Sequence, residues 1–303
     1  MEWRGVMPAM TTAFDAELNV DHGFVARHAK WLEENGCTGI VCLGSLGEAA
    51  TLDFGEKMDV VRTVAGAVRI PVVAAVSALS TAEAVQIAHG AREAGAQGLM
   101  ILPPYVYRGD WREMKAHVAA VLKATPLKAM LYNNPVAYGT DFLPEQIAEL
   151  AGEFANLAAV KESSTDVRRV TAIRALIGER LKIFVGVDDA IMEGIRAGAA
   201  GWIAGLVNAL PRESVDLFDH AIAGRDAEAF ELYKWFLPLL RMDSVPKFIQ
   251  LIKRVQQELG VGSARVRGPR LELVGAELDE VRTMVGKART TRPEAAQPST
   301  AFL

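Results

Sequence analysis

The sequence has few of the residues that build disulfide frameworks and metal sites. Only two of its 303 residues are cysteine, Cys37 and Cys42, and two are too few to hold a fold together by disulfides. No group of cysteine and histidine residues has the spacing of a zinc site, so we predict no metal ion. The scarcity of cysteine favours a reducing environment, and we expect a cytoplasmic protein.

Signals for membranes and nucleic acids are also missing from the sequence. No apolar run is long enough to span a bilayer, and Met1–Arg4 lacks the charged-then-apolar pattern of a signal peptide. The formal net charge of −4 gives no reason to expect nucleic acid or an anionic membrane as a partner. Hydrophobic residues make up 50% of the chain and charged residues 23%, so the chain can bury a sizeable core.

Eight short apolar runs with the character of strands alternate with longer segments of helical spacing. The runs are Val6–Thr12, Gly39–Leu43, Val72–Ser77, Gly98–Leu102, Lys128–Tyr132, Leu157–Lys161, Ile183–Val187 and Gly201–Ala204. Continuous apolar runs are typical of parallel strands buried on both faces. They predict an α/β protein, a (β/α)8 TIM barrel over residues 1–224. An open doubly wound sheet is the alternative, but residues 8–19 lack the glycine-rich phosphate loop that usually follows its first strand.

The chain beyond the predicted barrel contains helical patterns and no strand candidate. Helical spacing covers Asp226–Leu240, Val245–Leu259 and Glu277–Lys287. We therefore predict a C-terminal helical extension over residues 225–287 that packs on the barrel. Residues 288–303 are rich in Thr, Pro and Ala and have no periodicity, so we expect a flexible tail.

A lysine ends the sixth predicted strand, at the edge where (β/α)8 barrels carry their active sites. Lys161 follows the apolar residues 157–160 and should point into or above the barrel. Apolar surroundings disfavour the charged ammonium, and a neutral amine can attack a carbonyl or imine carbon. A snorkelling or salt-bridged lysine is the alternative. Tyr132, which ends the preceding strand, favours catalysis because its hydroxyl can transfer protons, although a tyrosine there can also simply line the rim.

Two further strand ends carry groups that could contact a substrate. The second strand is followed by Gly44-Ser45-Leu46-Gly47-Glu48, where small residues let backbone N–H groups approach an anion and Ser45 adds a hydroxyl donor. A substrate carboxylate fits such a loop, but a plain glycine-rich turn before a helix fits it too. The seventh strand ends in Asp188 and Asp189, which could bind substrate hydroxyls or cap the next helix. We favour capping for at least one of them.

Taken together, these motifs resemble a known family. G-S-L-G-E at 44–48, Y-N-N-P at 132–135, V-K-E-S at 160–163 and G-V-D-D at 186–189 have the order and spacing of the dihydrodipicolinate synthase / N-acetylneuraminate lyase family. The resemblance covers the predicted barrel and the helical extension. Members of this family are commonly homotetramers built from dimers, so the resemblance implies a homotetramer.

The resemblance also implies a role for each candidate residue. Lys161 corresponds to the lysine that forms the Schiff base, and Tyr132 to the tyrosine that relays protons. Ser45 corresponds to the hydroxyl residue that binds the carboxylate of a 2-oxo acid, with the backbone of Leu46 as a second donor. The predicted substrate-binding residues are Ser45, Leu46, Gly47 and Ile203.

Three positions depart from the synthase that gives the family its name. Leu46 stands where the synthase typically has a second hydroxyl residue, and Val106 where it has a relay tyrosine that reaches a neighbouring subunit. Ala137 stands where it has an arginine for the carboxylate of its aldehyde substrate. These losses argue against dihydrodipicolinate synthesis. They leave open whether Tyr105 or Tyr107 takes the place of the missing relay.

A branch of the family that acts in bacterial hydroxyproline breakdown is the closer match. Y-N-N-P-V-A-Y-G at 132–139, K-E-S-S-T-D-V-R-R at 161–169 and G-W-I-A-G-L-V-N-A at 201–209 resemble 1-pyrroline-4-hydroxy-2-carboxylate deaminase, with Tyr138 as a further lining residue. The resemblance implies a small 2-oxo acid or cyclic imine as substrate, 2,5-dioxopentanoate and ammonia as products, and no metal or organic cofactor. The alternatives are a 2-keto-3-deoxy sugar-acid dehydratase, a 2-oxo acid aldolase, the synthase itself and a non-catalytic 2-oxo acid sensor.

Overall fold

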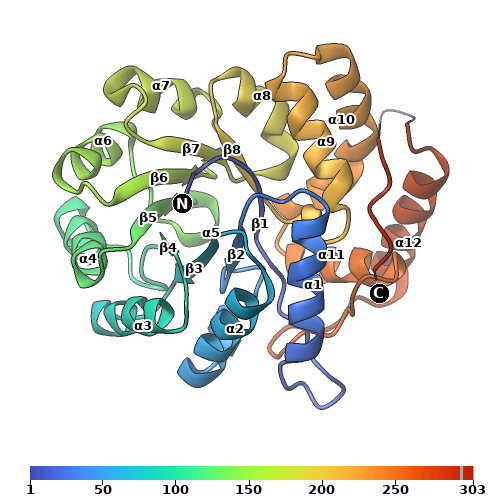
Figure 1. The fold of residues 1–303 in the computed structure, drawn as a ribbon, viewed down its shortest axis with the longest axis horizontal. Helices are drawn as coiled ribbons and strands as arrows, with labels where there is room; N and C mark the ends of the chain where they lie inside the picture. Colours follow the sequence, from blue (N-terminus) through green and yellow to red (C-terminus); the bar gives the residue numbers. More distant parts are fainter. Residues whose placement is uncertain (294–295, 303) are drawn as a thin grey trace.

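An eight-stranded parallel barrel forms the centre of the computed structural model, which describes residues 1–293 and 296–302 (Figure 1). The strands are β1 (Gly5–Pro8), β2 (Ile40–Cys42), β3 (Val72–Val76), β4 (Gly98–Ile101), β5 (Lys128–Asn133), β6 (Leu157–Glu162), β7 (Lys182–Val185) and β8 (Gly201–Ala204). Strands adjacent in sequence from β2 to β8 pair in parallel, and β1 pairs with β8. A parallel bridge between Ala9 and Val41 closes the ring. The predicted (β/α)8 TIM barrel is confirmed.

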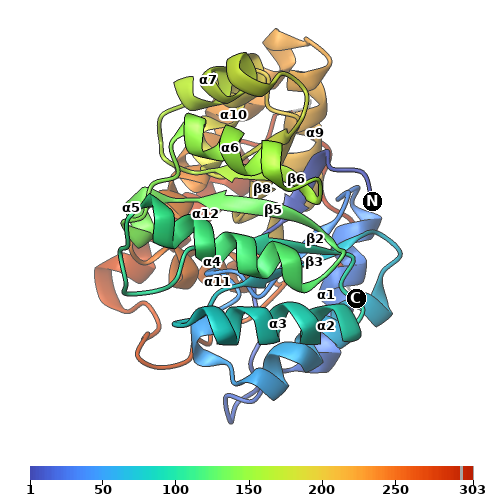
Figure 2. The same ribbon diagram turned by 90° about the vertical axis from the view of Figure 1, so that its left-hand side faces the viewer.

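Helices follow the strands and form an outer layer around the barrel (Figure 2). They are α1 (His22–Glu34), α2 (Phe54–Ala67), α3 (Thr81–Glu93), α4 (Trp111–Ala124), α5 (Pro135–Tyr138), α6 (Pro144–Glu153), α7 (Arg168–Ile177), α8 (Ile191–Arg196) and α9 (Pro211–Ile222). Asp53 and Asp110 begin α2 and α4 with capping boxes that satisfy the free N–H groups of the first turn. None of the helices among the described residues combines the length and apolarity needed to cross a membrane.

The first strand is shorter than the sequence predicts. The apolar run extends over 6–12, but β1 ends at Pro8. Beyond it, the Thr11 N–H donates to Asn208 Oδ1 at 3.2 Å, and Thr12 Oγ1 donates to the Gly47 carbonyl at 2.7 Å. These contacts take the place of strand pairing, so this part of the run is a loop at the mouth of the barrel.

The strand register decides which side chains share a face of the barrel. Tyr132 on β5 pairs with Lys161 on β6, and Lys161 pairs with Phe184 on β7. Phe184 pairs in turn with Gly201 on β8, where a Cβ atom would lie 2.2 Å from the phenylalanine ring. Paired residues of a parallel sheet point to the same side, so these four positions share one face.

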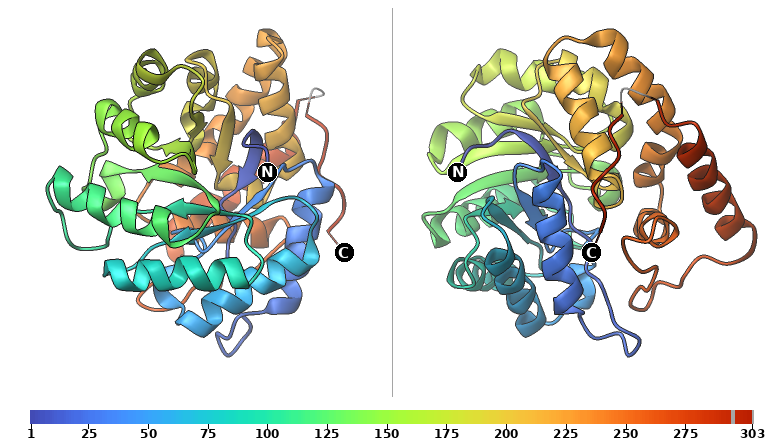
Figure 3. Two further views of the ribbon diagram at one scale, coloured as in Figure 1. Left: turned by 60° about the vertical axis from the view of Figure 1, so that its left-hand side comes forward. Right: turned by 45° about the vertical axis from the view of Figure 1, so that its right-hand side comes forward.

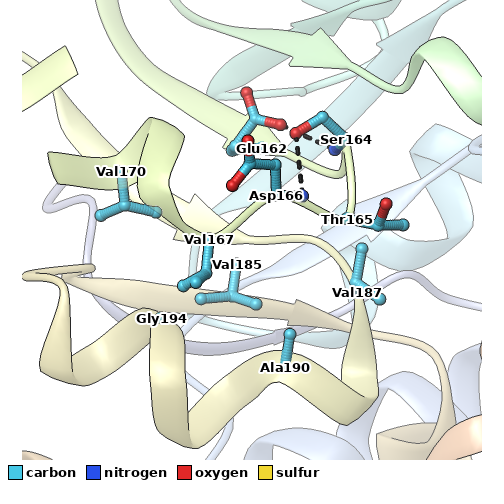
Figure 4. A pocket seen from close by; sticks show the side chains of 10 residues that line it. All are labelled: Glu162, Ser164, Thr165, Asp166, Val167, Val170, Val185, Val187, Ala190 and Gly194. Carbon is cyan, nitrogen blue, oxygen red and sulfur yellow. Dashed lines mark hydrogen bonds between the residues drawn. The ribbon is translucent and has the colours of Figure 1, made fainter. Parts of the chain in front are cut away.

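The opposite face of β6 and β7 packs against helices. Glu162 and Val185, which follow Lys161 and Phe184, line a shallow open cleft between these strands and α7 and α8 (Figure 4). Since side chains alternate along a strand, Lys161 and Phe184 point the other way, into the barrel. The cleft is therefore separate from the face that carries the lysine.

The C-terminal extension is helical and packs against the mouth of the barrel. It contains α10 (Asp226–Leu240), α11 (Phe248–Glu258) and α12 (Gly275–Thr290). Arg267, between α11 and α12, forms a bidentate ion pair with Glu56 on α2, with N···O distances of 2.6 and 2.8 Å. Thr11, after β1, donates to Gln256 Oε1 on α11 at 3.0 Å. These contacts tie the extension to the first two βα units.

Residues 300 and 302, in the segment predicted to be a flexible tail, contact α1. The chain turns back after α12 and runs towards α1 (Figure 3). The Thr300 N–H donates to Asn35 Oδ1 at 2.9 Å, and Trp31 Nε1 donates to the Thr300 carbonyl at 2.8 Å. The Phe302 ring lies 5.2 Å from the ring of Phe24, centroid to centroid. Composition alone does not reveal this packing, because its partners on α1 are distant in sequence.

Candidate active site

Lys161 and Tyr132 lie side by side on the inner face of the barrel. Lys161 Nζ is 4.3 Å from the centroid of the Tyr132 ring. Each residue is only 6% exposed. Within residues 1–293 and 296–302, no carboxylate pairs with Lys161 Nζ and no acceptor takes a hydrogen bond from it. This environment differs from that of a snorkelling or salt-bridged lysine and suits an amine that acts as a nucleophile.

The Tyr132 hydroxyl is oriented by the residue two positions further on. Asn134 Nδ2 donates to the Tyr132 hydroxyl at 3.0 Å, and Asn134 Oδ1 accepts the N–H of Ala137 at 2.9 Å. The second contact makes Asn134 the N-cap of α5 and fixes which end of its amide faces the tyrosine. Because its oxygen accepts from Asn134, the Tyr132 hydroxyl keeps its own proton for a substrate.

The loop after β2 forms a turn whose backbone N–H groups can receive a ligand. Among the residues that the structure describes, none accepts a hydrogen bond from the N–H groups of Ser45, Leu46 or Gly47. The Ser45 hydroxyl bonds to the hydroxyl of Tyr138. A Cβ atom on Gly47 would lie 2.9 Å from the carbonyl oxygen of Met10, so only glycine fits there. Free N–H groups beside a hydroxyl can bind a carboxylate.

A buried ion pair anchors this loop. Glu48 has a left-handed backbone with φ of 55° and is 0% exposed. Lys253 of α11 donates to Glu48 Oε1 at 2.7 Å and to the Thr12 carbonyl at 2.9 Å. The Arg267 N–H donates to Glu48 Oε2 at 3.0 Å. The extension thus fixes the loop of Ser45 through a contact that the sequence does not predict.

Asp188 has a capping role, but not the predicted one. The helix that follows, α8, has Ala190 at its N-cap and no side-chain cap. Asp188 instead accepts hydrogen bonds from Trp202 Nε1 at 3.0 Å, from the Gly205 N–H at 3.0 Å and from the Leu206 N–H at 2.9 Å. The prediction that one of the two acids caps the next helix is wrong, because Asp188 secures the turn after β8.

Two carboxyl groups lie close enough to Lys161 to be affected by its charge. Burial raises the pKa of Asp188 to about 6, against the opposing effects of its hydrogen bonds and of Lys161. Burial, together with the nearby Asp188, raises the pKa of Asp243 well above its usual range, and the charge of Lys161 again opposes the shift. Burial therefore favours the uncharged form of both carboxyl groups next to the lysine.

Two further residues, Gly186 and Ile203, lie on or beside the face of the barrel that carries Lys161. A Cβ atom at Gly186 would lie 2.6 Å from Lys161 Cε, so glycine leaves room for the lysine chain. Ile203 is two residues beyond Gly201 on β8, and therefore shares the face that carries Lys161. Leu46 is 3% exposed. The substrate-binding roles of Leu46, Gly47 and Ile203 remain predictions.

The comparisons with known proteins agree with this geometry. A model of the dihydrodipicolinate synthetase family matches residues 2–288. The 4-hydroxy-tetrahydrodipicolinate synthase of Halorhodospira halophila is 33% identical over 287 residues, which cover 92% of this chain and 95% of that protein. The chain belongs to the dihydrodipicolinate synthetase family. Enzymes of this family are class I lyases, which use a lysine to form a Schiff base.

Solved structures of the dihydrodipicolinate synthetase family share the fold of this chain over nearly its full length. The 4-hydroxy-tetrahydrodipicolinate synthase of Methylacidiphilum fumariolicum SolV has a TM-score of 0.92 at 26% identity and covers 95% of this chain and 97% of its own. The dihydrodipicolinate synthase of Aquifex aeolicus has a TM-score of 0.91 at 26% identity, over 95% and 98% of the two chains. The arrangement of the barrel and the C-terminal extension is therefore shared with these relatives.

The loop after β4 separates the two tyrosines that flank Val106. Val106 is 93% exposed and has a left-handed backbone with φ of 72°. Tyr107 is 55% exposed, and its hydroxyl donates to Glu113 Oε1 at 2.9 Å. Tyr105 is half-buried, and its ring centroid lies 5.6 Å from that of Tyr138. Of the two, only Tyr105 belongs to the cluster around Ser45.

Proposed function

We propose that this member of the family is a Schiff-base deaminase that converts 1-pyrroline-4-hydroxy-2-carboxylate into 2,5-dioxopentanoate and ammonia in hydroxyproline catabolism. The observation that carries the proposal is the buried Lys161 beside Tyr132, which suits attack on a carbon already activated as an imine. Ala137, where the synthase has an arginine, provides no cation for a second carboxylate. The site therefore favours a small substrate with one carboxylate.

The first half of the reaction opens the ring. Ser45 and the Leu46 N–H hold the substrate carboxylate, and Lys161 Nζ adds to C2. The ring nitrogen leaves C2 and takes a proton, which gives an open chain joined to Lys161 by a Schiff base. The Schiff base then accepts the electrons released when C3 loses a proton, and the 4-hydroxyl leaves as water. Tyr132 supplies and removes protons at these steps.

The second half releases ammonia and the lysine. The new double bond moves until the imine lies between C5 and the amino nitrogen, and water hydrolyses this imine to an aldehyde and ammonia. A second water hydrolyses the Schiff base and frees Lys161. One water leaves and two enter, so the balance is one cyclic imine and one water in, one 2,5-dioxopentanoate and one ammonia out.

Synthesis of 4-hydroxy-tetrahydrodipicolinate is the second candidate, because the relative at 33% identity bears that name. The apolar side chain of Leu46 and the exposed Val106 weaken this candidate, since neither offers the hydroxyl that the synthase has there. A sugar-acid dehydratase or 2-oxo acid aldolase would share Lys161 and Tyr132. A longer sugar acid, however, needs more polar groups than Leu46, Val106 and Ala137 provide.

Incubation of the purified protein with 1-pyrroline-4-hydroxy-2-carboxylate is expected to yield ammonia and 2,5-dioxopentanoate in equal amounts. Ammonia is measured by a coupled enzymatic assay, and the aldehyde by mass spectrometry after derivatisation. The matched comparison is formation of 4-hydroxy-tetrahydrodipicolinate by the same preparation under synthase conditions. Faster synthase turnover, with no ammonia from the cyclic imine, would reverse the order of the two candidates.

We further propose that the protein is a homotetramer arranged as a dimer of dimers. Exposed apolar side chains follow three neighbouring strands, with Leu79 after β3, Val106 after β4 and Val136 after β5, at 67%, 93% and 72% exposure. Apolar side chains exposed at three neighbouring strand ends favour contact with a second copy of the chain. Light scattering is expected to give four times the chain mass of 32.7 kDa, and a smaller mass for Val106→Lys. Leu271→Lys, on the extension, is the control, and a monomeric wild type would contradict the assembly.

A further inference from the structure

A short, well-fixed helix directs Tyr138 across the mouth of the barrel. In α5, Asn134 caps the N-terminus, Pro135 occupies the first turn, and Gly139 ends the helix with a left-handed φ of 70°. The Gly139 N–H closes the turn on the Pro135 carbonyl at 2.8 Å. Since these contacts determine the turn, the position of Tyr138 is set by the chain segment that directly follows Tyr132.

Tyr138 contacts groups from three different strand ends. Its hydroxyl bonds to the Ser45 hydroxyl, which follows β2. Its ring meets the Tyr132 ring of β5 nearly edge to face, with centroids 5.7 Å apart and planes at 80°. The ring of Tyr105, which follows β4, is a second neighbour, with its centroid 5.6 Å from that of Tyr138. Tyr138 therefore lies between the predicted carboxylate site and the half-buried tyrosine at the rim.

We propose that Tyr138 is the central member of a proton path, Ser45–Tyr138–Tyr105, that links the reacting substrate to solvent within one protomer. The inner end is Ser45, which lies beside the reacting carbon if it holds the carboxylate. The outer end is Tyr105, which reaches solvent. The proposal rests on the Schiff-base part of the proposed function. The proposed path assigns Tyr105 to the role of the relay tyrosine that the synthase has at the position of Val106. Tyr107 is excluded, since its hydroxyl bonds to Glu113 outside the cluster.

The path moves one proton without leaving a charge behind. Alongside Tyr132, the Ser45 hydroxyl accepts a proton that leaves the substrate and passes its own proton to Tyr138. Tyr138 passes its proton to Tyr105, which releases one to water, and the reverse order delivers a proton. Burial raises the pKa of Tyr138 well above its usual range, and the neighbouring Tyr132 and Tyr105 raise it further. A free phenolate is thus disfavoured, and the transfers occur together. Tyr138 acts through Ser45 and is a positioning and relay residue.

Exchange of the methyl protons of pyruvate for deuterium tests the path without the natural substrate. A Schiff base between pyruvate and Lys161 labilises these protons, and their loss in D₂O is followed by proton NMR. Tyr138→Phe keeps the ring that packs on Tyr105 and Tyr132 but removes the hydroxyl. We expect its exchange rate at saturating pyruvate to fall about 10²-fold, the usual effect of losing general acid–base help.

The amount of trapped adduct separates a relay from a structural role. Removing a relay slows proton transfer but does not change an equilibrium, so borohydride should trap as much pyruvate on Lys161 in Tyr138→Phe as in the wild type. Tyr105→Phe should also slow exchange. Tyr107→Phe is the matched control and should exchange at the wild-type rate, because Tyr107 is 55% exposed and its hydroxyl bonds to Glu113.

Three results would overturn the path. Wild-type exchange in Tyr138→Phe would show that the hydroxyl is not needed. Loss of both adduct and exchange in a folded variant would show that Tyr138 holds the substrate instead. If the wild type exchanged no methyl protons, both the Schiff-base assignment and the proton path would be contradicted. If the variants behave as expected but the cyclic imine yields no ammonia, only the substrate assignment fails.

Discussion

Replacing Lys161 by alanine is expected to lower turnover at least about 10⁴-fold, as removal of a covalent nucleophile does elsewhere. The lysine is buried beside Tyr132 and holds no partner among the described residues, so its removal leaves no other amine on the inner face next to Tyr132. The loss should appear in the maximal rate, because Ser45 and the Leu46 N–H can still bind the carboxylate. Steady-state assay of ammonia release measures it.

Lys128→Ala is the matched control for this variant. Lys128 begins β5, at the opposite end of the strand that carries Tyr132, and its side chain is exposed. Its loss should leave turnover unchanged. Borohydride with pyruvate should add mass to the wild type and to Lys128→Ala, but not to Lys161→Ala. Near wild-type turnover in Lys161→Ala, or an adduct that survives the substitution, would end the Schiff-base assignment.

The barrel could be predicted because each of its strands is recognisable from a short stretch of the sequence. A buried parallel strand is a continuous apolar run, and the predicted bounds of β8 agree with those observed, while β5 and β6 each run one residue further. The first strand was predicted too long, over 6–12. Thr11 and Thr12 hydrogen-bond to Asn208 and Gly47, which are distant in sequence, and do not pair in the sheet. Apolar periodicity contains no information about such distant side chains.

In the candidate site, too, features set by neighbouring residues could be predicted and contacts between distant residues could not. Lys161 and Tyr132 could be placed together because each ends a strand and adjacent strands of a barrel are neighbours, and the register pairs them directly. The reach of Tyr138 to Ser45 could not be predicted, because it depends on the turn of α5 and on a loop 93 residues earlier. The ion pair of Lys253 with Glu48 could not be predicted either, because the two residues are 205 positions apart and belong to no common sequence motif.

Substitution of Lys253 by methionine is expected to lower the free energy of unfolding by about 3 to 5 kcal/mol, the range for breaking a buried ion pair. Lys253 and Glu48 have side chains 2% and 0% exposed, so methionine fills the space but leaves a carboxylate in a dry environment. The Arg267 N–H stays at 3.0 Å and Arg270 lies 3.8 Å from Glu48, which favours the lower end of the range. Urea denaturation followed by circular dichroism measures the change.

Two matched variants show whether this effect comes from the buried charge. Lys247→Met breaks an ion pair with Glu277 whose side chains are 52% and 50% exposed, and should lower stability by less than about 1 kcal/mol. In the double variant Lys253→Met with Glu48→Gln no buried carboxylate is left without its lysine, and at least about half of the lost stability should return. Equal losses in the single and double variants would mean that packing, rather than charge, dominates. Since Glu48 fixes the loop of Ser45, the KM for the carboxylate substrate should rise with the loss of stability and fall with its recovery.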